Sequence, residues 1–343
     1  MHSPSLFTGS EGEMMSLAAM QKTLKGLVRV DLEMEVLTGL LIRMPVHAQV
    51  YRIGGADLYP IITKRKYLLS DQREGMEIEV EVPIVPGSSL KGRMRGLLEL
   101  ALGKSLYSTD GRIWLHARMF SGREMYGERY GMQLSEMESD IISRCEIDEI
   151  FGAPAIGIDQ LLEAYARRLA DRSKAQEEVS KLVPALAITR LLVDDMYPTV
   201  EYVRALSENG NRLISIADFL EEKGENRIDR VTSAADPRQV VRVKPGVVFG
   251  GALRLLVFDI DKGYVKRNLE IVARGLKFVE ETYLGASGSR GYGRVKFRDL
   301  SVAVAKASDP ALSYQEIGKF DDVEGLLAKV GDVASKIEQA LFQ

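Results

Sequence analysis

The chain has 343 residues, of which 45% are apolar, enough to fill the core of one large domain or two smaller ones. Its formal net charge is −3 and its pI is about 5.9, which excludes a strongly basic protein of the kind that binds nucleic acid through its overall charge. Composition alone favours a small-molecule enzyme, and any nucleic-acid interface must come from local clusters of Lys and Arg.

Residues suited to redox or metal chemistry are few. Cys145 is the single cysteine, so a disulfide framework and a cysteine-rich zinc site are excluded and a reducing compartment is expected. The three histidines, His2, His47 and His116, are far apart in sequence, which argues against a His-centred triad or a HExxH metal site. No signal-peptide pattern and no long uncharged apolar run occurs, so we expect a cytoplasmic protein with no membrane association.

Two segments near the N-terminus alternate apolar and charged residues, which predicts half-buried strands over 27–37 and 76–84. Pro83 indicates that the second strand ends there or lies at a sheet edge. The stretch "VPGSSLKGRMRGLLEL" follows at 85–100, and Ser88 or Ser89 is predicted to cap a helix. The apolar face of this helix comprises Leu90, Met94, Leu97 and Leu98.

The middle of the chain is less regular. Residues 104–182 are predicted to form a mostly helical insertion, and 183–206 contain strand-like apolar runs. Residues 207–246 are polar, rich in Arg and poor in aromatic residues, which is typical of a projecting arm.

The C-terminal third repeats the β-α pattern. It predicts a buried strand over 246–260, a helix over 268–284, a strand over 294–304, and a peripheral helical tail over 306–343. Residues 1–103 and 247–305 would thus form the two parts of one α+β core, joined by the strands of 183–206. The order of elements predicts a ferredoxin-like (RRM-type) fold with long insertions.

Three local clusters of charge could bind an anion. In the first, the start of the helix after Ser88 and Ser89 presents backbone N–H groups, and Lys91 and Arg95 lie on one side of that helix with Arg93 on another. An ordinary solvated helix face explains the same pattern equally well.

The second cluster is the glycine-rich segment "LGASGSRGYGRVK" at 284–296. Glycines at 285, 288, 291 and 293 allow close approach of a phosphate, and Ser289 and Arg290 lie among them. The segment is not a Walker A loop, because no Gly-Lys-Ser/Thr ends it, and taken alone it is more typical of a tight turn.

The third cluster lies in the arm and comprises Arg227, Arg230, Arg238, Arg242 and Lys244. Such a density of guanidinium groups could clamp a phosphate backbone. The interspersed acidic residues Glu225, Asp229 and Asp236 leave a salt-bridged surface hairpin as the alternative.

Taken together, these stretches resemble the RAMP superfamily of CRISPR-associated proteins. The matching segments are "IVPGSSLKGRMRGLLEL", "IFGAP" at 150–154, "ENRIDRVTSAADPRQVVRV" and "YLGASGSRGYGRVKF", in this order. More narrowly, they resemble the repeated backbone subunit of type III, Csm-like effector complexes. The resemblance covers about half of the chain and leaves out residues 104–145 and the C-terminal tail.

The resemblance implies a ferredoxin-like palm, a helical lid and a β-hairpin thumb. It implies that copies of the chain form a helical backbone along a guide (cr)RNA, together with other subunits such as a large polymerase-like one. It also implies cleavage of a complementary target RNA with Mg²⁺ or another divalent cation. The lid of many relatives holds zinc, but His116 and Cys145 are too few to do so, and we expect no zinc.

By the same resemblance, Asp57 would be the catalytic residue and a metal ligand. The family's histidine after the first strand is replaced by Leu41, the loop is longer, and Arg43 or Arg52 could supply the missing RNA contact. The RNA-binding residues would be Arg52, Ser88, Ser89, Lys91, Arg93, Arg95, Arg227, Arg230, Arg238, Arg242, Gly288, Ser289, Arg290 and Gly291.

Three alternatives remain open from the sequence. Asp57 is also a natural turn residue after Gly54 and Gly55. The chain could be a non-catalytic scaffold that binds guide RNA, or a guide-processing endoribonuclease of the same superfamily. The last is disfavoured because His47 and His116 lie outside the motifs.

Overall fold

The structure is a computed structural model that describes residues 22–44, 58–69, 77–106, 112–116, 144–153, 162–163, 165–166, 169–186, 188–207 and 212–343. The strands are β1 (Leu24–Val36), β2 (Ile62–Leu68), β3 (Glu77–Pro83), β4 (Leu191–Val193), β5 (Tyr197–Pro198), β6 (Leu220–Ile228), β7 (Ala235–Val243), β8 (Val248–Phe258), β9 (Val295–Lys306) and β10 (Gln315–Asp322). The α-helices are α2 (Gly87–Ala101), α5 (Glu146–Phe151), α7 (Arg172–Leu186), α8 (Val200–Leu206), α9 (Val265–Glu281) and α10 (Val323–Phe342), with short 3₁₀ helices η3 (Ile216–Asp218), η4 (Asp259–Asp261) and η5 (Gly288–Arg290).

The fold is mixed α/β and its sheets are antiparallel. The main sheet has the order β10-β9-β1-β8-β4, with β5 also paired to β8. β1 lies at its centre, where Val30 is opposite Leu253 of β8 and Val302 of β9. The alternation predicted for 27–37 is confirmed, because the apolar side chains of β1 are buried and the charged ones between them are half-exposed.

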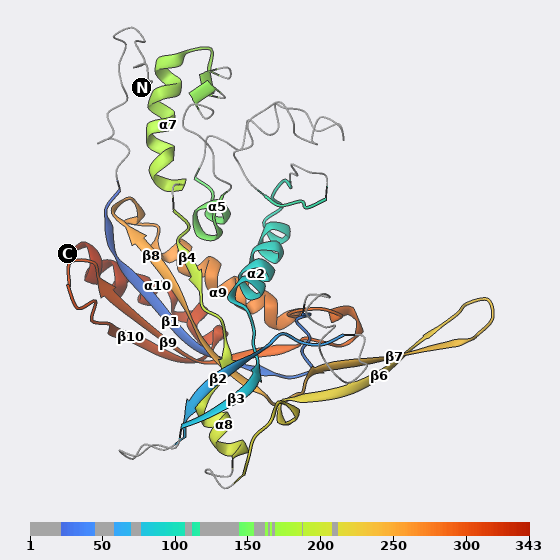
Figure 1. Ribbon diagram of the computed structural model, residues 1–343. Helices are drawn as coiled ribbons and strands as arrows, with labels where there is room; N and C mark the ends of the chain where they lie inside the picture. Colours follow the sequence, from blue (N-terminus) through green and yellow to red (C-terminus); the bar gives the residue numbers. More distant parts are fainter. Residues whose placement is uncertain are drawn as a thin grey trace, which may run out of the picture.

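Helices α2, α9 and α10 lie against one face of this sheet (Figure 1). Gly275 of α9 makes the close packing possible, because a Cβ there would lie 3.0 Å from Met94 Cε of α2. On α2, Leu90, Met94 and Leu98 are buried as predicted. The other face of the sheet carries the charged residues of β1.

The predicted strand 76–84 appears as β3, but it is not part of the main sheet. It pairs with β2 in a separate two-stranded sheet and ends at Pro83. Glu77, Glu79 and Glu81 are exposed and Val80 and Val82 are buried, as the alternation predicts. The arm within 207–246 contains a second separate sheet, the β6–β7 hairpin, which projects away from the helices (Figure 1).

Residues 306–343 differ from the predicted peripheral helical tail. Residues 315–322 form β10, which adds a strand to the main sheet beside β9. The helix α10 that follows packs on α9 and β9 and buries Val323, Val330 and Ile337. Residues 200–206, within the region expected to hold strands, form α8, because the hydroxyl of Thr199 caps the Tyr202 N–H.

The predicted capping of α2 by Ser88 or Ser89 is wrong. The helix begins one residue earlier, at Gly87, whose N–H donates to Asp195 Oδ1 at 2.8 Å. A Cβ at position 87 would lie 2.2 Å from the Val193 carbonyl oxygen, so glycine lets the helix start against β4. A carboxylate of the protein itself therefore lies at this helix N-terminus, and the predicted RNA contacts of Ser88 and Ser89 stay predictions.

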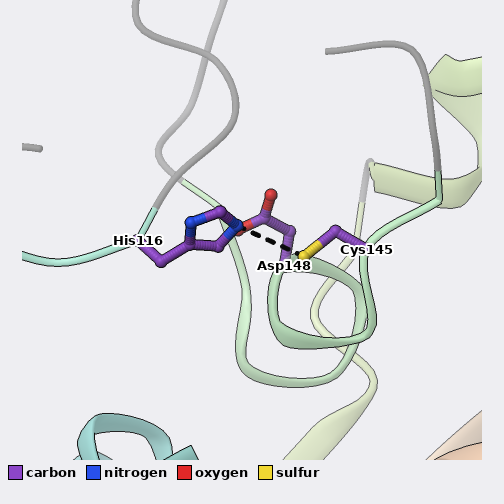
Figure 2. A group of neighbouring side chains, drawn as sticks. All are labelled: His116, Cys145 and Asp148. Atoms are coloured by element: carbon purple, nitrogen blue, oxygen red, sulfur yellow. Dashed lines mark hydrogen bonds between the residues drawn. The ribbon is translucent and has the colours of Figure 1, made fainter. Parts of the chain in front are cut away.

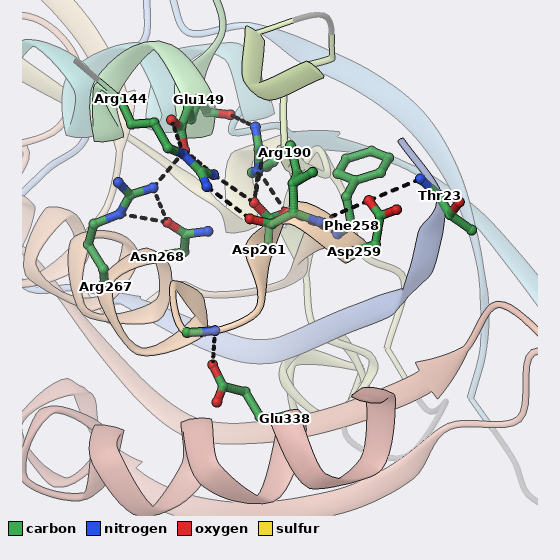
Figure 3. Close-up of polar contacts among 12 residues, drawn as sticks. Thr23, Arg144, Glu149, Arg190, Phe258, Asp259, Asp261, Arg267, Asn268 and Glu338 are labelled. Carbon is green, nitrogen blue, oxygen red and sulfur yellow. Dashed lines mark hydrogen bonds and ion pairs between the residues drawn. The ribbon is translucent and has the colours of Figure 1, made fainter. Parts of the chain in front are cut away.

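A buried ion-pair network ties α5, β4 and α9 together (Figure 3). Arg190 is fully buried immediately before β4, and its guanidinium donates to both carboxylate oxygens of Asp261 at 2.8–3.1 Å. Arg144 donates to Asp261 at 3.0 Å and to Glu149 of α5 at 2.8 Å. Arg267 of α9 donates to the other oxygen of Glu149 at 2.6 Å.

Replacing Asp261 by Ala is expected to lower the free energy of unfolding by about 3–5 kcal/mol, because Arg190 would be left buried without its carboxylate. Denaturant unfolding followed by circular dichroism measures the change. Glu316→Ala, which removes an exposed ion pair with Lys319, is the control and is expected to leave the midpoint unchanged. A midpoint for Asp261→Ala equal to that of the control would contradict the structural importance of the network.

Candidate functional site

The glycine-rich loop, residues 284–293, packs directly on the segment that follows β1. The Ala286 N–H donates to the Leu41 carbonyl at 2.7 Å, and the Gly293 N–H donates to the Gly39 carbonyl at 3.0 Å. Gly285 has a φ of 80°, and a Cβ there would lie 2.5 Å from the Leu41 oxygen. Part of the glycine content is therefore explained by this close backbone contact, as the turn interpretation predicts.

Tyr283 joins the glycine-rich loop to α2. The Arg93 guanidinium carbon lies 4.0 Å from the centre of the Tyr283 ring, and Arg93 Nε donates to the Tyr283 carbonyl at 2.9 Å. On the loop side, a Cβ at Gly288 would lie 2.0 Å from Tyr283 Cγ. Two of the three predicted charge clusters are thus brought together by one aromatic ring.

The three basic residues of α2 differ in how they are used. Among the described residues, the two terminal guanidinium nitrogens of Arg93 have no hydrogen-bond partner, so they are available to an external anion. Lys91 Nζ donates to the Leu191 carbonyl at 2.8 Å, and burial, with Arg95 nearby, lowers the pKa of its amine.

Arg95 points into the protein. Its guanidinium donates to Glu99 at 2.7 Å and to the carbonyls of Gly152 and His116 at 2.9 and 2.6 Å. All three nitrogens are engaged, so Arg95 connects α2 to the segments around His116 and Gly152.

The arm arginines divide in the same way. Arg227 and Arg238 are exposed and lie 2.9 and 3.9 Å from Asp236, and Arg230 is exposed near the turn. These pairs match the salt-bridged hairpin alternative without removing the exposed guanidinium groups. Arg242 at the root of the hairpin is largely buried and pairs with Glu221 at 2.7 Å.

The glycine-rich loop leaves Ser289, Arg290 and Gly291 exposed. Arg290 donates to the Ser287 hydroxyl at 2.8 Å within the loop, and η5 spans Gly288–Arg290. The loop therefore offers backbone and one guanidinium group to solvent beside Arg93 and Tyr283.

Asp57 and Arg52 lie outside the described residues, so their predicted roles stay predictions. The residue after Asp57 is described: the Leu58 carbonyl accepts a hydrogen bond from the Val241 N–H at 3.0 Å, beside the root of the hairpin. Leu58 also packs on a small buried cluster of Leu41, Val240 and Tyr292.

Sequence reasoning missed the aromatic residues of this site. Tyr283 precedes the glycine-rich loop and Tyr292 lies between Gly291 and Gly293. Both rings lie beside arginines, Tyr283 4.0 Å from Arg93 and Tyr292 4.6 Å from Arg242. The sequence feature that could have identified them is a tyrosine near each end of the glycine-rich segment.

The open face of the main sheet carries a hollow of about 500 Å³. Its charged lining residues are Arg29, Arg65, Arg254, Asp31, Asp194 and Asp195. Positive and negative charges are balanced, and Arg29 and Arg254 pair with Asp31 and Asp194. The described residues that line this hollow therefore carry no excess of positive charge, which a polyanion requires.

One group of side chains among the described residues has the composition of a metal site (Figure 2). Ligand atoms of His116, Cys145 and Asp148 all lie within 4.8 Å of one another and are buried, with Cys145 Sγ 3.3 Å from His116 Nε2. Asp148 adds a donor that sequence reasoning did not count. Structural zinc sites use four protein ligands, one more than this group supplies, and the absence of zinc stays a prediction.

Gly288→Ala is expected to lower the free energy of unfolding by about 1–3 kcal/mol, because the added Cβ would collide with the Tyr283 ring. The matched control is Gly92→Ala on α2, where a Cβ meets nothing within 4 Å and alanine favours the helix. Thermal unfolding compares the two variants. Equal melting temperatures would show that Tyr283 is not held against the loop.

None of the helices in the part of the chain that the structure describes is long and apolar enough to cross a membrane.

Three known proteins that are similar to this chain share the name Csm3. The chain is 29% identical over 273 residues to the "CRISPR system Cms endoribonuclease Csm3" of Methanothermobacter thermautotrophicus, covering 78% of this chain and 84% of that protein. A protein of the same name from Streptococcus thermophilus is 29% identical over 221 residues, covering 64% and 70%. A crystal structure of Methanopyrus kandleri Csm3 aligns over 92% of this chain and 98% of that chain, with 20% identity and a TM-score of 0.49.

The family described as "RAMP superfamily" matches residues 76–296. That range includes α2, the β6–β7 hairpin and the glycine-rich loop, the elements that meet at the site. Because the match covers more than half of the sequence, this chain belongs to the RAMP superfamily.

Proposed function

We propose that this chain is a guide (cr)RNA-binding backbone subunit of a type III CRISPR interference complex, and that it cleaves complementary target RNA at regular spacing with a divalent metal ion. The observation that carries the proposal is the similarity, over 78% of the chain, to a protein named as a Csm3 endoribonuclease. The convergence of α2, the glycine-rich loop and the hairpin root on one side of the molecule supports it.

We extend the proposal to the fold. Six elements occur along the chain in the order β-α-β-β-α-β, with other elements inserted between them: β1, α2, β4, β8, α9 and β9. The four strands of this set have the spatial order β9-β1-β8-β4. This arrangement supports a ferredoxin-like palm. The β6–β7 hairpin would be the thumb, and residues 104–182 would be the lid.

The guide backbone would run past Arg93 and the exposed tip of the glycine-rich loop. The free edge of the Arg93 guanidinium, the backbone around Ser289 and Gly291, and Arg290 would contact phosphates. Arg227, Arg230 and Arg238 would act from the thumb. The engaged guanidinium groups of Arg95 and Arg242 would instead shape the surface that the RNA meets.

Asp57 would be the catalytic residue. Its carboxylate would bind a divalent cation such as Mg²⁺, which stabilises negative charge at the phosphate, or would orient the target 2′-hydroxyl for attack on the adjacent phosphate. Its sequence neighbour Leu58 is attached to the root of the thumb, which supports a cut beside the thumb. Partners would be further copies of the chain, target RNA and other type III subunits, including the large polymerase-like one.

Replacing Arg93 by Ala is expected to weaken guide-RNA binding and to lower the slope of log affinity against log salt by about 1, because one phosphate contact is lost. Filter binding over a range of salt concentrations measures both. Lys319→Ala, on the exposed edge strand β10, is the control of equal charge change and is expected to bind like wild type. Identical slopes for the two variants would place the RNA elsewhere.

Asp57→Ala is expected to abolish the regularly spaced cuts of a guide-complementary RNA while RNA binding survives. The reconstituted complex with Mg²⁺ is compared with wild type on a sequencing gel. Cuts that persist in the variant would favour the non-catalytic alternative for this residue. Cleavage of repeat RNA at one site by the purified chain, unassisted, would instead favour a guide-processing enzyme.

A further inference from the structure

We propose that Tyr292 is a positioning residue that fixes the direction of the β6–β7 hairpin relative to the glycine-rich loop, and thereby sets the nucleotide at which target RNA is cut. The inference rests on the proposed function, since the cut position is defined only if the chain cleaves target RNA. It concerns a side chain that the proposed RNA contacts and the proposed catalytic group do not include.

Tyr292 is held from several sides by the root of the hairpin. It is 1% exposed, and its hydroxyl donates to Glu225 Oε1 at 2.6 Å. Lys223 Nζ and the Arg242 guanidinium carbon lie 4.4 and 4.6 Å from the centre of its ring. We call Tyr292, Lys223, Glu225 and Arg242 the Tyr292 cluster.

The hairpin residues of the Tyr292 cluster lie on one face of the hairpin. Lys223 and Glu225 are two residues apart on β6, so their side chains point the same way, and Glu221 precedes them in the same alternation. Arg242 is opposite Glu221 in the ladder and pairs with it at 2.7 Å. One face of the hairpin root therefore carries the residues that contact the glycine-rich loop.

The same root also contacts the segment after β1. Arg242 lies over Gly39, where a Cβ would be 2.1 Å from Arg242 Nε. Leu41 and Val240 pack on the Tyr292 ring, and Leu58 packs against this cluster. Tyr292 thus lies where the loop, the hairpin and the residue after Asp57 meet.

Beyond its root, the hairpin has little to fix its direction. Ile228 and Val231 near its turn are 56% and 92% exposed. From Leu220 to Ile228 the strand extends roughly 26 Å at about 3.3 Å per residue. A tilt of about 10° at the root would move the far end by about 4.5 Å, more than the spacing of about 3.4 Å between successive nucleotides in one strand of duplex DNA.

The test compares three variants in the reconstituted complex. Tyr292→Phe removes the hydrogen bond to Glu225 and keeps the ring between the two cations. Tyr292→Leu removes the ring as well. Tyr314→Phe is the matched control, because Tyr314 is 38% exposed and immediately precedes β10, the edge strand of the main sheet that pairs with β9 and not with the hairpin. Hydrogen exchange of the β6 and β7 amides reports the docking of the hairpin, and a sequencing gel reports the cut positions.

We expect exchange of the β6 and β7 amides to rise by about tenfold in Tyr292→Leu and by less in Tyr292→Phe. The phenylalanine variant loses only the hydrogen bond to Glu225, whereas the leucine variant also loses the contacts of the ring with Lys223 and Arg242. The cuts are expected to spread to neighbouring nucleotides in the same order, and the control is expected to leave both exchange and cut positions unchanged.

Unchanged exchange in both variants would overturn the inference, because the hairpin would then not depend on Tyr292. Raised exchange with cuts at unchanged nucleotides would also overturn it, as would a loss of binding and cutting together without any spread. A wild-type complex that does not cut target RNA would overturn the proposed function instead. The exchange measurement separates these failures, because it does not need cleavage.

Discussion

The buried contact between Arg190 and Asp261 is the constraint on which the arrangement of the site depends. Placing a guanidinium group in a core is costly unless its charge and its donors are satisfied, and here the carboxylate of Asp261 accepts three of its contacts. The same carboxylate accepts from Arg144, which also holds Glu149 of α5. Since β4 follows Arg190 directly and Asp261 precedes α9, this pair sets how the strand and the helix meet.

The position of α2 follows from that of β4. Gly87 begins the helix against the Val193 carbonyl, and Asp195, just beyond β4, accepts its N–H. The helix then carries Arg93 to Tyr283, where the glycine-rich loop begins. The position of the candidate RNA contacts thus depends on a series of contacts that begins with the buried ion pair. The later contacts in this series involve backbone atoms and an aromatic ring rather than exposed charges.

The formal net charge of −3 is consistent with this arrangement. Several cations near the site and on the sheet are paired with carboxylates, as Arg242 is with Glu221 and Arg298 is with Glu33 and Glu35. A few guanidinium groups, above all Arg93, keep donors for an outside anion. A nucleic-acid interface of this kind depends on where a small number of charges lie, and an overall pI does not detect it.

Some of these features follow from the sequence because they are local. The alternation in β1, β3 and β9, the apolar face of α2 and the polar β6–β7 hairpin are set by residue spacing, and the motifs that resemble the RAMP superfamily can be read without a structure. Tertiary structure decided three other features: the buried contacts of the Arg95 side chain, the hydrogen bond from the start of α2 to Asp195, and the pairing of β10 with β9. It also decided the placement of Tyr292 between Lys223 and Arg242. In each of these cases the partner lies far away along the chain, or the choice depends on which surface remains to be covered once the sheet has formed, and no local pattern carries that information.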